Sequence, residues 1–471
     1  MRDYHNCEKT STLSVLFRAS FSASKSFAEN APLQPELVVP APTLEVRLPA
    51  IYQSGSDLGR RASCPTIFEA TMPPSSIQRF RAGGFTSCFS DIYSTRGRIE
   101  VTPFLRKILG LNWLLMAVML ALAIFGVIAI YSATYMREDP VAAEFWRKQA
   151  NWVAVGFFAF IIVSLIDYRW VRWGALPMYL AGLGFLILTR FMGHKVYGAR
   201  SWLSIAGVNF QPAQLAVIAG IMVLSLFLSQ FRQMHPMLRL TLCGAVVGAP
   251  CLLILMQPDL GECLIWGPVL VALLFVGGIP VRYLICIFLI VIAFIPIAIN
   301  LGLKPYQQER ITAFINPDID RQGSAWAINQ SLIAIGSGGW SGKGFKAPNT
   351  QIELGFLPAT AVHNDYIFSA IGEQWGFVGG ILLLGGFGLL LLICLFVAFC
   401  AGDQFGLLLV VGITTLIFTH IFQNIGMTIS VLPITGVPLP LISYSGSFVL
   451  MIMFGLGIVN SVWVHRRGDL R

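Results

Sequence analysis

Long apolar runs fill this sequence from about residue 112 to about residue 464, and they constrain its fold more than any other feature. A helix needs roughly 17–25 mostly apolar residues to cross the hydrocarbon layer of a membrane, whereas a barrel strand needs about ten residues of alternating polarity. The runs here are continuous. Hydrophobic residues make up 56% of the chain and charged residues only 12%, so a soluble protein of this composition could not hydrate its surface. The sequence therefore predicts an all-α polytopic membrane protein.

The apolar runs divide into about ten transmembrane helices. Their approximate ranges are 112–135, 150–166, 174–189, 210–229, 240–256, 263–280, 283–301, 366–397, 405–427 and 441–464. One long polar loop, residues 302–364, separates the seventh helix from the eighth. Lys and Arg are more frequent at the flanks that share a side with the two termini, and basic residues favour cytoplasmic flanks. We therefore expect both termini in the cytoplasm and the long loop outside.

Residues 1–105 differ in kind from the rest of the chain. This segment is rich in Ser, Pro and Arg and has no sustained apolar period, which predicts a disordered tail or a start codon assigned too far upstream. Residues 106–471 then form the ten-helix domain. The net charge of +9 is carried by loops and tails, which in a membrane protein indicates orientation and anionic headgroups rather than nucleic acid. The nine cysteines show no CxxC or Cys/His spacing, which argues against zinc and disulfides.

Placement outside the cell limits the chemistry that the long loop can perform. Neither ATP nor a nucleotide sugar is available there, and the sequence has no P-loop and no Gly-rich dinucleotide motif. A bond-forming step on that side must use a substrate already activated by its own leaving group. The sequence thus predicts no nucleotide cofactor.

Asp365 is the strongest candidate for chemistry. It stands at the mouth of the eighth predicted helix, in the run His363-Asn364-Asp365-Tyr366-Ile367-Phe368. A carboxylate near the hydrocarbon edge is costly unless it faces a wet cavity or a partner, which favours a functional role. The structural alternative is an acid at a helix N-terminus, stabilised by the helix dipole.

Other polar residues in or beside the apolar runs have both structural and functional interpretations. Three of them share one face of the ninth predicted helix, and hydrogen bonding between helices is their favoured role: His420, Gln423 and Asn424. Asp259, in the break between the fifth and sixth helices, fits a helix cap better than a cation site. Trp202, close to Arg200, could stack on a sugar ring, but anchoring at the membrane interface is favoured.

The long loop combines glycines with cations in a pattern suited to an anion. Three cations, Arg310, Lys343 and Lys346, accompany the glycine-rich runs Gly336-Ser337-Gly338-Gly339 and Gly342-Lys343-Gly344. Glycines let backbone N–H groups approach an anion closely, and Lys or Arg supplies the charge. The pattern predicts either a phosphate cradle or a set of turns.

Taken in order, five short motifs of this sequence resemble those of the SEDS proteins, the family of RodA and FtsW. The resemblance covers roughly residues 108–467 and is closer to the elongation members than to the division members. The motifs are Gln211-Pro212, Gln257-Pro258-Asp259-Leu260-Gly261, Ile335-Gly336-Ser337-Gly338-Gly339 with Gly342-Lys343-Gly344, His363-Asn364-Asp365-Tyr366-Ile367-Phe368 with Gly372-Glu373, and Gly436-Val437-Pro438-Leu439-Pro440 with Ser443-Tyr444-Ser445-Gly446-Ser447.

The resemblance implies an inverting peptidoglycan glycosyltransferase that polymerises lipid II at the outer face of the bacterial cytoplasmic membrane, for cell elongation and rod shape. A divalent cation, Mg²⁺ or Mn²⁺, is an optional cofactor. The implied partners are the growing glycan strand, a class B penicillin-binding protein and other elongation-complex membrane proteins. The implied general base is Asp365, and the implied substrate-binding residues are Trp202, Arg200, Arg310, Lys343 and Glu373.

The sequence departs from the family pattern inside the membrane. Gln214 and Val217 stand where the family usually has a glutamate and a lysine, so an acid and a base are both missing from these positions. Losing both together avoids an unpaired buried charge. Two alternatives to a polymerase follow: a flippase for a lipid-linked sugar, which would need a polar path through the bundle, or a polymerase-inactive scaffold for a class B penicillin-binding protein.

Overall fold

The computed structural model describes residues 107–134, 144–196, 199–205, 208–301, 305–315, 324–358 and 361–466. Residues 1–105, predicted as a tail or a misassigned start, lie outside this part of the chain. Within it, eight helices are long and apolar enough to cross a membrane, and two shorter apolar helices begin at Leu260 and Val281. These ten helices confirm the predicted all-α polytopic fold.

The ten apolar helices agree with the predicted ranges to within a few residues at most ends. They are α3 (Trp113–Thr134), α5 (Phe145–Leu165), α6 (Val171–Met192), α7 (Pro212–Gln230), α8 (Pro236–Met256), α9 (Leu260–Val276), α10 (Val281–Leu301), α13 (Ile367–Phe399), α14 (Gln404–Thr428) and α15 (Gly446–His465).

Two regions predicted as connections contain regular structure of their own. Between α6 and α7, three short strands form an antiparallel sheet in the order β1-β2-β3: β1 (His194–Val196), β2 (Ala199–Ile205) and β3 (Val208–Phe210). The long polar loop contains two helices, α11 (Pro305–Ile315) and α12 (Ser324–Ser337). Neither helix was predicted, because the loop is polar overall and the apolar stretch within it, in α12, is short.

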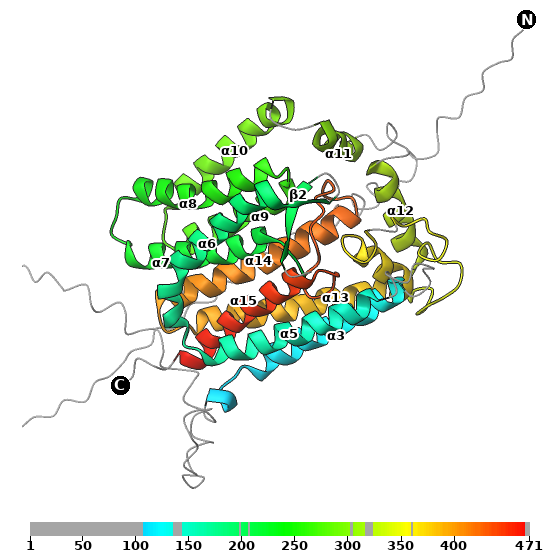
Figure 1. Ribbon diagram of the computed structural model, residues 1–471, viewed down its shortest axis with the longest axis horizontal. Coiled ribbons are helices and arrows are strands. Elements are labelled where there is room, and N and C mark those ends of the chain that lie inside the picture. Colours follow the sequence, from blue (N-terminus) through cyan, green and yellow to red (C-terminus); the bar gives the residue numbers. More distant parts are fainter. Residues whose placement is uncertain are drawn as a thin grey trace, which may run out of the picture. The chain divides into compact units, whose positions relative to one another are not determined.

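α14 lies at the centre of the bundle, in contact with α7, α9, α13 and α15 (Figure 1). In the most apolar stretch of α14, 72% of the residues are buried inside the protein, against 22% in α5. A helix that is apolar on every side fits such a central position. Polar side chains on α14 must therefore find partners within the protein, which makes each of them informative about the site.

α13 is interrupted at Gly376, whose φ is +62°. Next to the interruption, backbone groups of residues 373–374 and 377–378 bond to the backbone of loop residues 339–344, at 2.9–3.1 Å. An unbroken helix would make these bonds within itself. Gly342 has φ +80°, and a methyl group on it would stand 2.1 Å from a backbone oxygen of α13. The loop is therefore docked into the break of α13 through its backbone.

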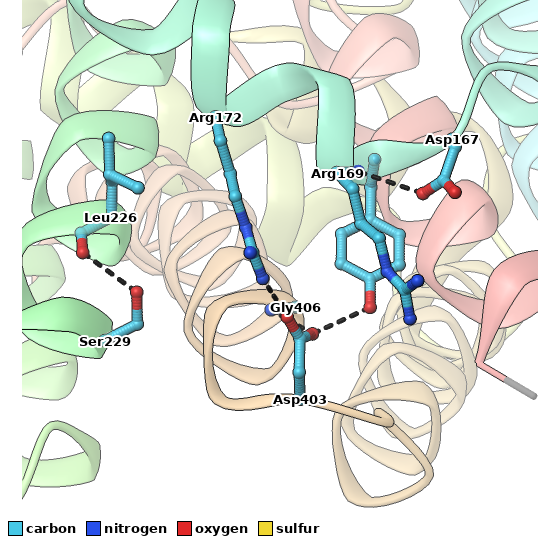
Figure 2. Close-up of polar contacts among 8 residues, drawn as sticks. Asp167, Arg169, Arg172, Leu226, Ser229, Asp403 and Gly406 are labelled. Carbon is cyan, nitrogen blue, oxygen red and sulfur yellow. Dashed lines mark hydrogen bonds and ion pairs between the residues drawn. The ribbon is translucent and has the colours of Figure 1, made fainter. Parts of the chain in front are cut away.

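At the end of the bundle where α6 and α14 begin, Asp403 joins these two helices (Figure 2). Its Oδ1 accepts hydrogen bonds from the Gly406 N–H at 3.1 Å and from the Tyr168 hydroxyl at 2.7 Å. Its Oδ2 forms an ion pair with the guanidinium of Arg172. Tyr168 belongs to the short helix η3 (Tyr168–Trp170) that leads into α6. One carboxylate thus caps α14 and anchors the start of α6.

Candidate functional site

Asp365 lies in the turn that precedes α13, at the end of the bundle opposite to Asp403. The carbonyl of Ala361 accepts hydrogen bonds from the N–H groups of Asn364, Asp365 and Tyr366, at 3.0, 2.9 and 3.1 Å. One acceptor shared by three donors closes residues 361–366 into a compact turn. This turn leads directly into α13, whose N-cap residue Tyr366 makes no side-chain capping bond.

The carbonyl groups of the same turn are held by the C-terminal quarter of the chain. The carbonyls of residues 363–365 accept hydrogen bonds, in order, from the Tyr444 N–H, the Ser443 hydroxyl and the Asn424 side-chain amide, at 2.8, 2.5 and 2.9 Å. The same amide donates to the carbonyl of Val437 at 2.8 Å. The Gly436–Gly446 segment, with its resemblance to a family motif, thus serves to fix the backbone of Asp365.

The side chain of Asp365 is crowded by protein but keeps some contact with solvent. Burial raises the pKa of its carboxyl to about 6, the Arg310 guanidinium acts in the opposite direction, and the Asp259 carboxylate raises the pKa further. A methyl group added at Gly436 would stand 3.7 Å from Oδ2, so this glycine borders the carboxylate. A carboxyl in this state can accept a proton near neutral pH.

Asp259 and Arg310 share the site with Asp365, although they come from different elements. Asp259 precedes α9 and caps it, accepting the N–H of Glu262 at 3.3 Å, which confirms the predicted cap. Burial raises the pKa of Asp259 and the nearby Arg310, on α11, lowers it. The structure therefore gives Asp259 a second role beside the cap, as a charged neighbour of Asp365. Sequence reasoning missed this role because 105 residues separate the two acids along the chain.

Trp202 lies on β2, beside this cluster but on the other face of its strand. The neighbouring residue Ser201 is buried and its hydroxyl faces Asp259. Successive side chains of a strand point to opposite faces, so Trp202 points away from Asp259. Trp202 is partly exposed, and its sugar-binding role stays a prediction. For Arg200 the structure describes the backbone in β2 and not the side chain.

Lys343 and Glu373 are bound to each other at the break in α13. The Lys343 ammonium lies 2.7 Å from Oε1 of Glu373, a side chain with no exposed surface. The same oxygen accepts the N–H of Gln351 at 2.6 Å. The structure thus brings these two predicted substrate-binding residues together as a brace between the loop and α13. The charges that act on Asp365 in the described part of the chain are Arg310 and Asp259.

A buried acid occupies the membrane region near Gln214, where the sequence had indicated none. The Glu262 carboxylate on α9 accepts a hydrogen bond from the Gln214 amide and a longer one, of 3.4 Å, from the Gln211 amide. Glu262 is 3% exposed. A single glutamate in an otherwise apolar run was the available signal, since ionisable residues inside membrane helices are rare.

The polar face of α14 divides between structure and site. Asn424 reaches the site through its bonds to Asp365 and Val437, which confirms hydrogen bonding between elements for this residue. His420 is fully buried, its Nδ1 lies 2.9 Å from the Leu416 carbonyl, and its ring packs on Phe448 at 4.8 Å. His420 therefore bonds within its own helix and packs in the interior of the bundle, so the prediction of hydrogen bonding between helices is wrong for this residue.

Comparison with known families identifies the chain. The family model of FtsW, RodA and SpoVE, described as cell cycle proteins, matches residues 112–468. The chain belongs to the FtsW/RodA/SpoVE family. Together with its eight long apolar helices, this membership makes it an integral membrane protein.

Two curated members of the FtsW/RodA/SpoVE family illustrate the similarity. The peptidoglycan glycosyltransferase RodA of Treponema pallidum is 30% identical, and the match covers 76% of this chain and 98% of that protein. The peptidoglycan glycosyltransferase MrdB of Escherichia coli K12 is 33% identical over 354 residues, covering 75% of this chain and 93% of that protein.

Solved structures of the FtsW/RodA/SpoVE family have the same fold. The rod shape determining protein RodA of Thermus thermophilus is 26% identical, with a TM-score of 0.57, and the match covers 76% of this chain and 98% of that chain. A chain from a peptidoglycan synthase complex, solved to explain how polymerization and crosslinking are coordinated, is 27% identical with a TM-score of 0.65. That match covers 76% of this chain and 99% of that chain.

Proposed function

We propose that this chain is a peptidoglycan glycosyltransferase that joins lipid II units into glycan strands at the outer face of the bacterial cytoplasmic membrane, in cell elongation. Its relatives from Treponema pallidum and Escherichia coli carry the name peptidoglycan glycosyltransferase. The observation that carries the proposal is the Asp365 carboxyl. It stands at the mouth of a membrane helix, with its backbone fixed by hydrogen bonds, a pKa raised to about 6 and Arg310 nearby.

In the proposed reaction Asp365 is the general base. It removes the proton from the 4-hydroxyl of the acceptor's GlcNAc, and the resulting oxygen nucleophile attacks C1 of the donor's MurNAc. The bond from C1 to the pyrophosphate oxygen breaks as the glycosidic bond forms, so C1 inverts and undecaprenyl pyrophosphate leaves with the bonding electrons. A base with a pKa near 6 is mostly ionised at neutral pH and still accepts a proton readily.

The remaining residues of the site support the charge changes of this reaction. Negative charge grows on the pyrophosphate oxygen as it leaves, and the guanidinium of Arg310 offsets it. Trp202 and Arg200 are proposed to contact the sugar and phosphate parts of the lipid. Lys343 and Glu373 stay proposed as substrate-binding residues, and their ion pair gives them a structural role as well.

A divalent cation, Mg²⁺ or Mn²⁺, fits the site as an aid to the leaving group. Asp259 and Asp365 are the residues that would hold it, because both carry carboxylates and the Asp259 carboxylate acts electrostatically on Asp365. The described residues include no group of three or more His, Cys, Asp or Glu suited to a metal. Two carboxylates suffice for a cation that also binds substrate phosphates, as Mg²⁺ commonly does. When bound, such an ion would neutralise charge on the pyrophosphate.

We also propose that both termini lie in the cytoplasm, so that Asp365, α11 and α12 face outside, where a class B penicillin-binding protein crosslinks the strands. The distribution of Lys and Arg supports this orientation. Similarity to a chain of a peptidoglycan synthase complex supports such a partner. Other membrane proteins of the elongation complex are proposed as further partners.

A polymerisation assay tests the function. The full chain is purified, with and without its class B penicillin-binding protein, and incubated with lipid II, and glycan strands are resolved on a gel. We expect strands from the unmodified chain and a loss of at least about 100-fold for Asp365→Asn, the effect of removing a general base. The matched control is Asp167→Asn, whose carboxylate accepts the Arg169 N–H at the opposite end of the bundle (Figure 2).

The other results of this assay would point elsewhere. Equal polymer from Asp365→Asn and the unmodified chain would remove Asp365 from the mechanism. No polymer under any condition, with binding to the penicillin-binding protein retained, would favour the scaffold. Translocation of lipid II across vesicle membranes at a rate unaffected by Asp365→Asn would favour the flippase.

A further inference from the structure

An apolar groove runs between α3 and α13, two helices that lie side by side (Figure 1). Its volume is about 410 Å³. Every residue that lines it is aliphatic, aromatic or glycine, among them Ala121, Leu122 and Phe125 of α3 and Gly379, Leu382 and Gly386 of α13. None of the charged groups of the catalytic site lines the groove, so the groove is a separate candidate binding site.

The groove opens toward the surrounding membrane. Leu382 on its wall is 70% exposed and Leu389 at its far end is 43% exposed. After the break in α13, the lining residues of that helix run from Gly379 to Leu389, a rise of roughly 15 Å at 1.5 Å per residue. One leaflet of a bilayer has a hydrocarbon depth of roughly 15 Å, half of the total thickness. The groove is therefore about as long as one leaflet's acyl chain.

A cation stands beyond one end of the groove. The rings of Phe125 and Trp375 close this end, with centroids 5.3 Å apart, and Trp375 also contacts Phe345 at 6.0 Å. The next residue, Lys346, holds its ammonium 2.7 Å from the Tyr131 hydroxyl and 4.1 Å from the centroid of that ring. Tyr131 lies six residues after Phe125 on α3, or roughly 9 Å further along the helix. The apolar groove suits the hydrocarbon part of an anionic amphiphile, and the cation beyond its end suits the charged part.

We propose that this groove binds one acyl chain of an anionic glycerophospholipid, with the lipid phosphate at Lys346. The length of the groove favours a leaflet-sized chain over a much longer polyprenyl chain. Its volume disfavours a partner's helix, because a helix about 10 Å across would displace roughly three times this volume over the same length. The attraction between phosphate and ammonium selects an anionic headgroup.

The position of this lipid connects it to the loop. Phe345 and Lys346 directly follow the loop residues 339–344 that are docked into the break of α13. A lipid held between Lys346 and the groove therefore binds the docked loop and both helices at once. Since it binds the folded chain, it raises the melting temperature as its concentration rises.

Quenching of tryptophan fluorescence by a brominated phospholipid tests the proposal on the full chain in detergent. Brominated phosphatidylglycerol quenches a tryptophan that its acyl chain touches, and the difference between the unmodified chain and Trp375→Phe isolates the signal of Trp375. Two matched variants place the same bulk on α3: Ala121→Phe inside the groove and Ala117→Phe, one turn away and outside it. Lys346→Gln removes the cation, and Lys148→Gln on α5 is its control.

We expect the dissociation constant of phosphatidylglycerol to rise at least 10-fold in Ala121→Phe and Lys346→Gln and to stay unchanged in both controls. Brominated phosphatidylcholine should bind at least 10-fold more weakly than phosphatidylglycerol. Equal binding by Ala121→Phe and Ala117→Phe, or equal binding of the two phospholipids, would overturn the proposal. Polyprenyl phosphate that competes more tightly than phosphatidylglycerol would replace the phospholipid as occupant. The melting temperature of each variant without lipid separates loss of binding from loss of folding.

Discussion

The side-chain amide of Asn424 donates a hydrogen bond of 2.9 Å to the main-chain carbonyl of Asp365, and a second one of 2.8 Å to the carbonyl of Val437. Through this one side chain, the central helix α14 sets the position of a turn that carries the proposed base. Asn424 is fully buried, so water cannot replace it. Asn424 is a positioning residue for Asp365.

Replacing Asn424 with leucine, which has a similar size and no donor, should lower kcat by about 10- to 100-fold, because small misplacements of a reacting group are costly. KM should change little, since the Asn424 amide donates to backbone carbonyls. Steady-state polymerisation of lipid II measures both constants. Thr415→Val on the same helix, whose hydroxyl bonds only to the Val411 carbonyl, should leave both unchanged. A normal kcat in a folded Asn424→Leu variant would contradict the positioning role.

The pKa of Asp365 should govern the acidic limb of the pH profile. Only the ionised carboxylate accepts a proton, so kcat/KM should fall about tenfold per pH unit below a pH of about 6 and level off above it. Initial rates of strand formation from pH 4.5 to 8 measure the limb. A flat profile through this range would mean that another group is the base.

The neighbours of Asp365 should move this limb in opposite directions. Arg310 favours the ionised carboxylate, so Arg310→Gln should raise the pKa of Asp365 and shift the limb to higher pH. Asp259 disfavours it, so Asp259→Asn should lower the pKa and shift the limb to lower pH. The control is Lys148→Gln, which removes a cation of α5 that is paired with Glu144, and it should leave the limb in place. Shifts of the same sign for both site variants would refute this electrostatic account.

The ion pair of Lys343 with Glu373 should contribute to the stability of the fold. Lys343→Met leaves a buried carboxylate without its cation and should lower the free energy of unfolding by about 2–4 kcal/mol, a little less than for a fully buried pair because 27% of the lysine side chain is exposed. Adding Glu373→Gln removes the unpaired charge and should restore most of the loss.

Kinetics of that double variant separate the two roles of these residues. If the pair only braces the loop, the refolded double variant has a normal KM for lipid II. If either residue binds substrate, KM rises although the melting temperature has recovered. Thermal unfolding in detergent and initial-rate measurements on the same preparations decide between these outcomes.

The break in α13 should depend on Gly376. Its φ of +62° disfavours any side chain, and a methyl group would stand 2.3 Å from the Gly342 nitrogen. With ψ at −159° this backbone conformation is open essentially only to glycine, so we expect Gly376→Ala to lower stability by about 1–3 kcal/mol. Gly385→Ala, in the same helix with open space around it, should instead be neutral or stabilise by roughly 0.5–1 kcal/mol. Equal losses in both variants would show that the loop does not need this glycine.

The helices of this fold could be predicted from the sequence because the membrane imposes a length and polarity on each one. Asp365 was identifiable for the same reason, as an acid at the edge of an apolar run. The partners of the turn that carries Asp365 were not. The hydrogen bonds that Asn424, Ser443 and Tyr444 donate to the carbonyls of residues 363–365 depend on the tertiary packing of distant segments, which no local pattern encodes.

Other parts of the site escaped prediction for related reasons. Asp259 was correctly predicted as a helix cap, because a cap depends on neighbouring residues of the sequence. The electrostatic effect of Asp259 on Asp365 depends on tertiary structure and could not be predicted in the same way. The hydrogen bond that Gln214 donates to Glu262 joins α7 to α9, so no local pattern at either position predicts it. Lys343 was interpreted as a phosphate-binding cation, and its pairing with Glu373 followed only from the docking of the loop.

The hydrogen bonds that fix the turn of Asp365 come from residues that are synthesised much later than the turn itself. Asn424 follows Asp365 by 59 residues, and Ser443 follows Asn364 by 79 residues. A nascent chain therefore exposes the proposed base well before the groups that fix it have left the ribosome, since chains are ordered from the N-terminus during synthesis. Until its last two helices have entered the membrane, the polymerase holds an unpositioned carboxylate. Truncated chains that lack these helices would accordingly have no polymerase activity in the membrane.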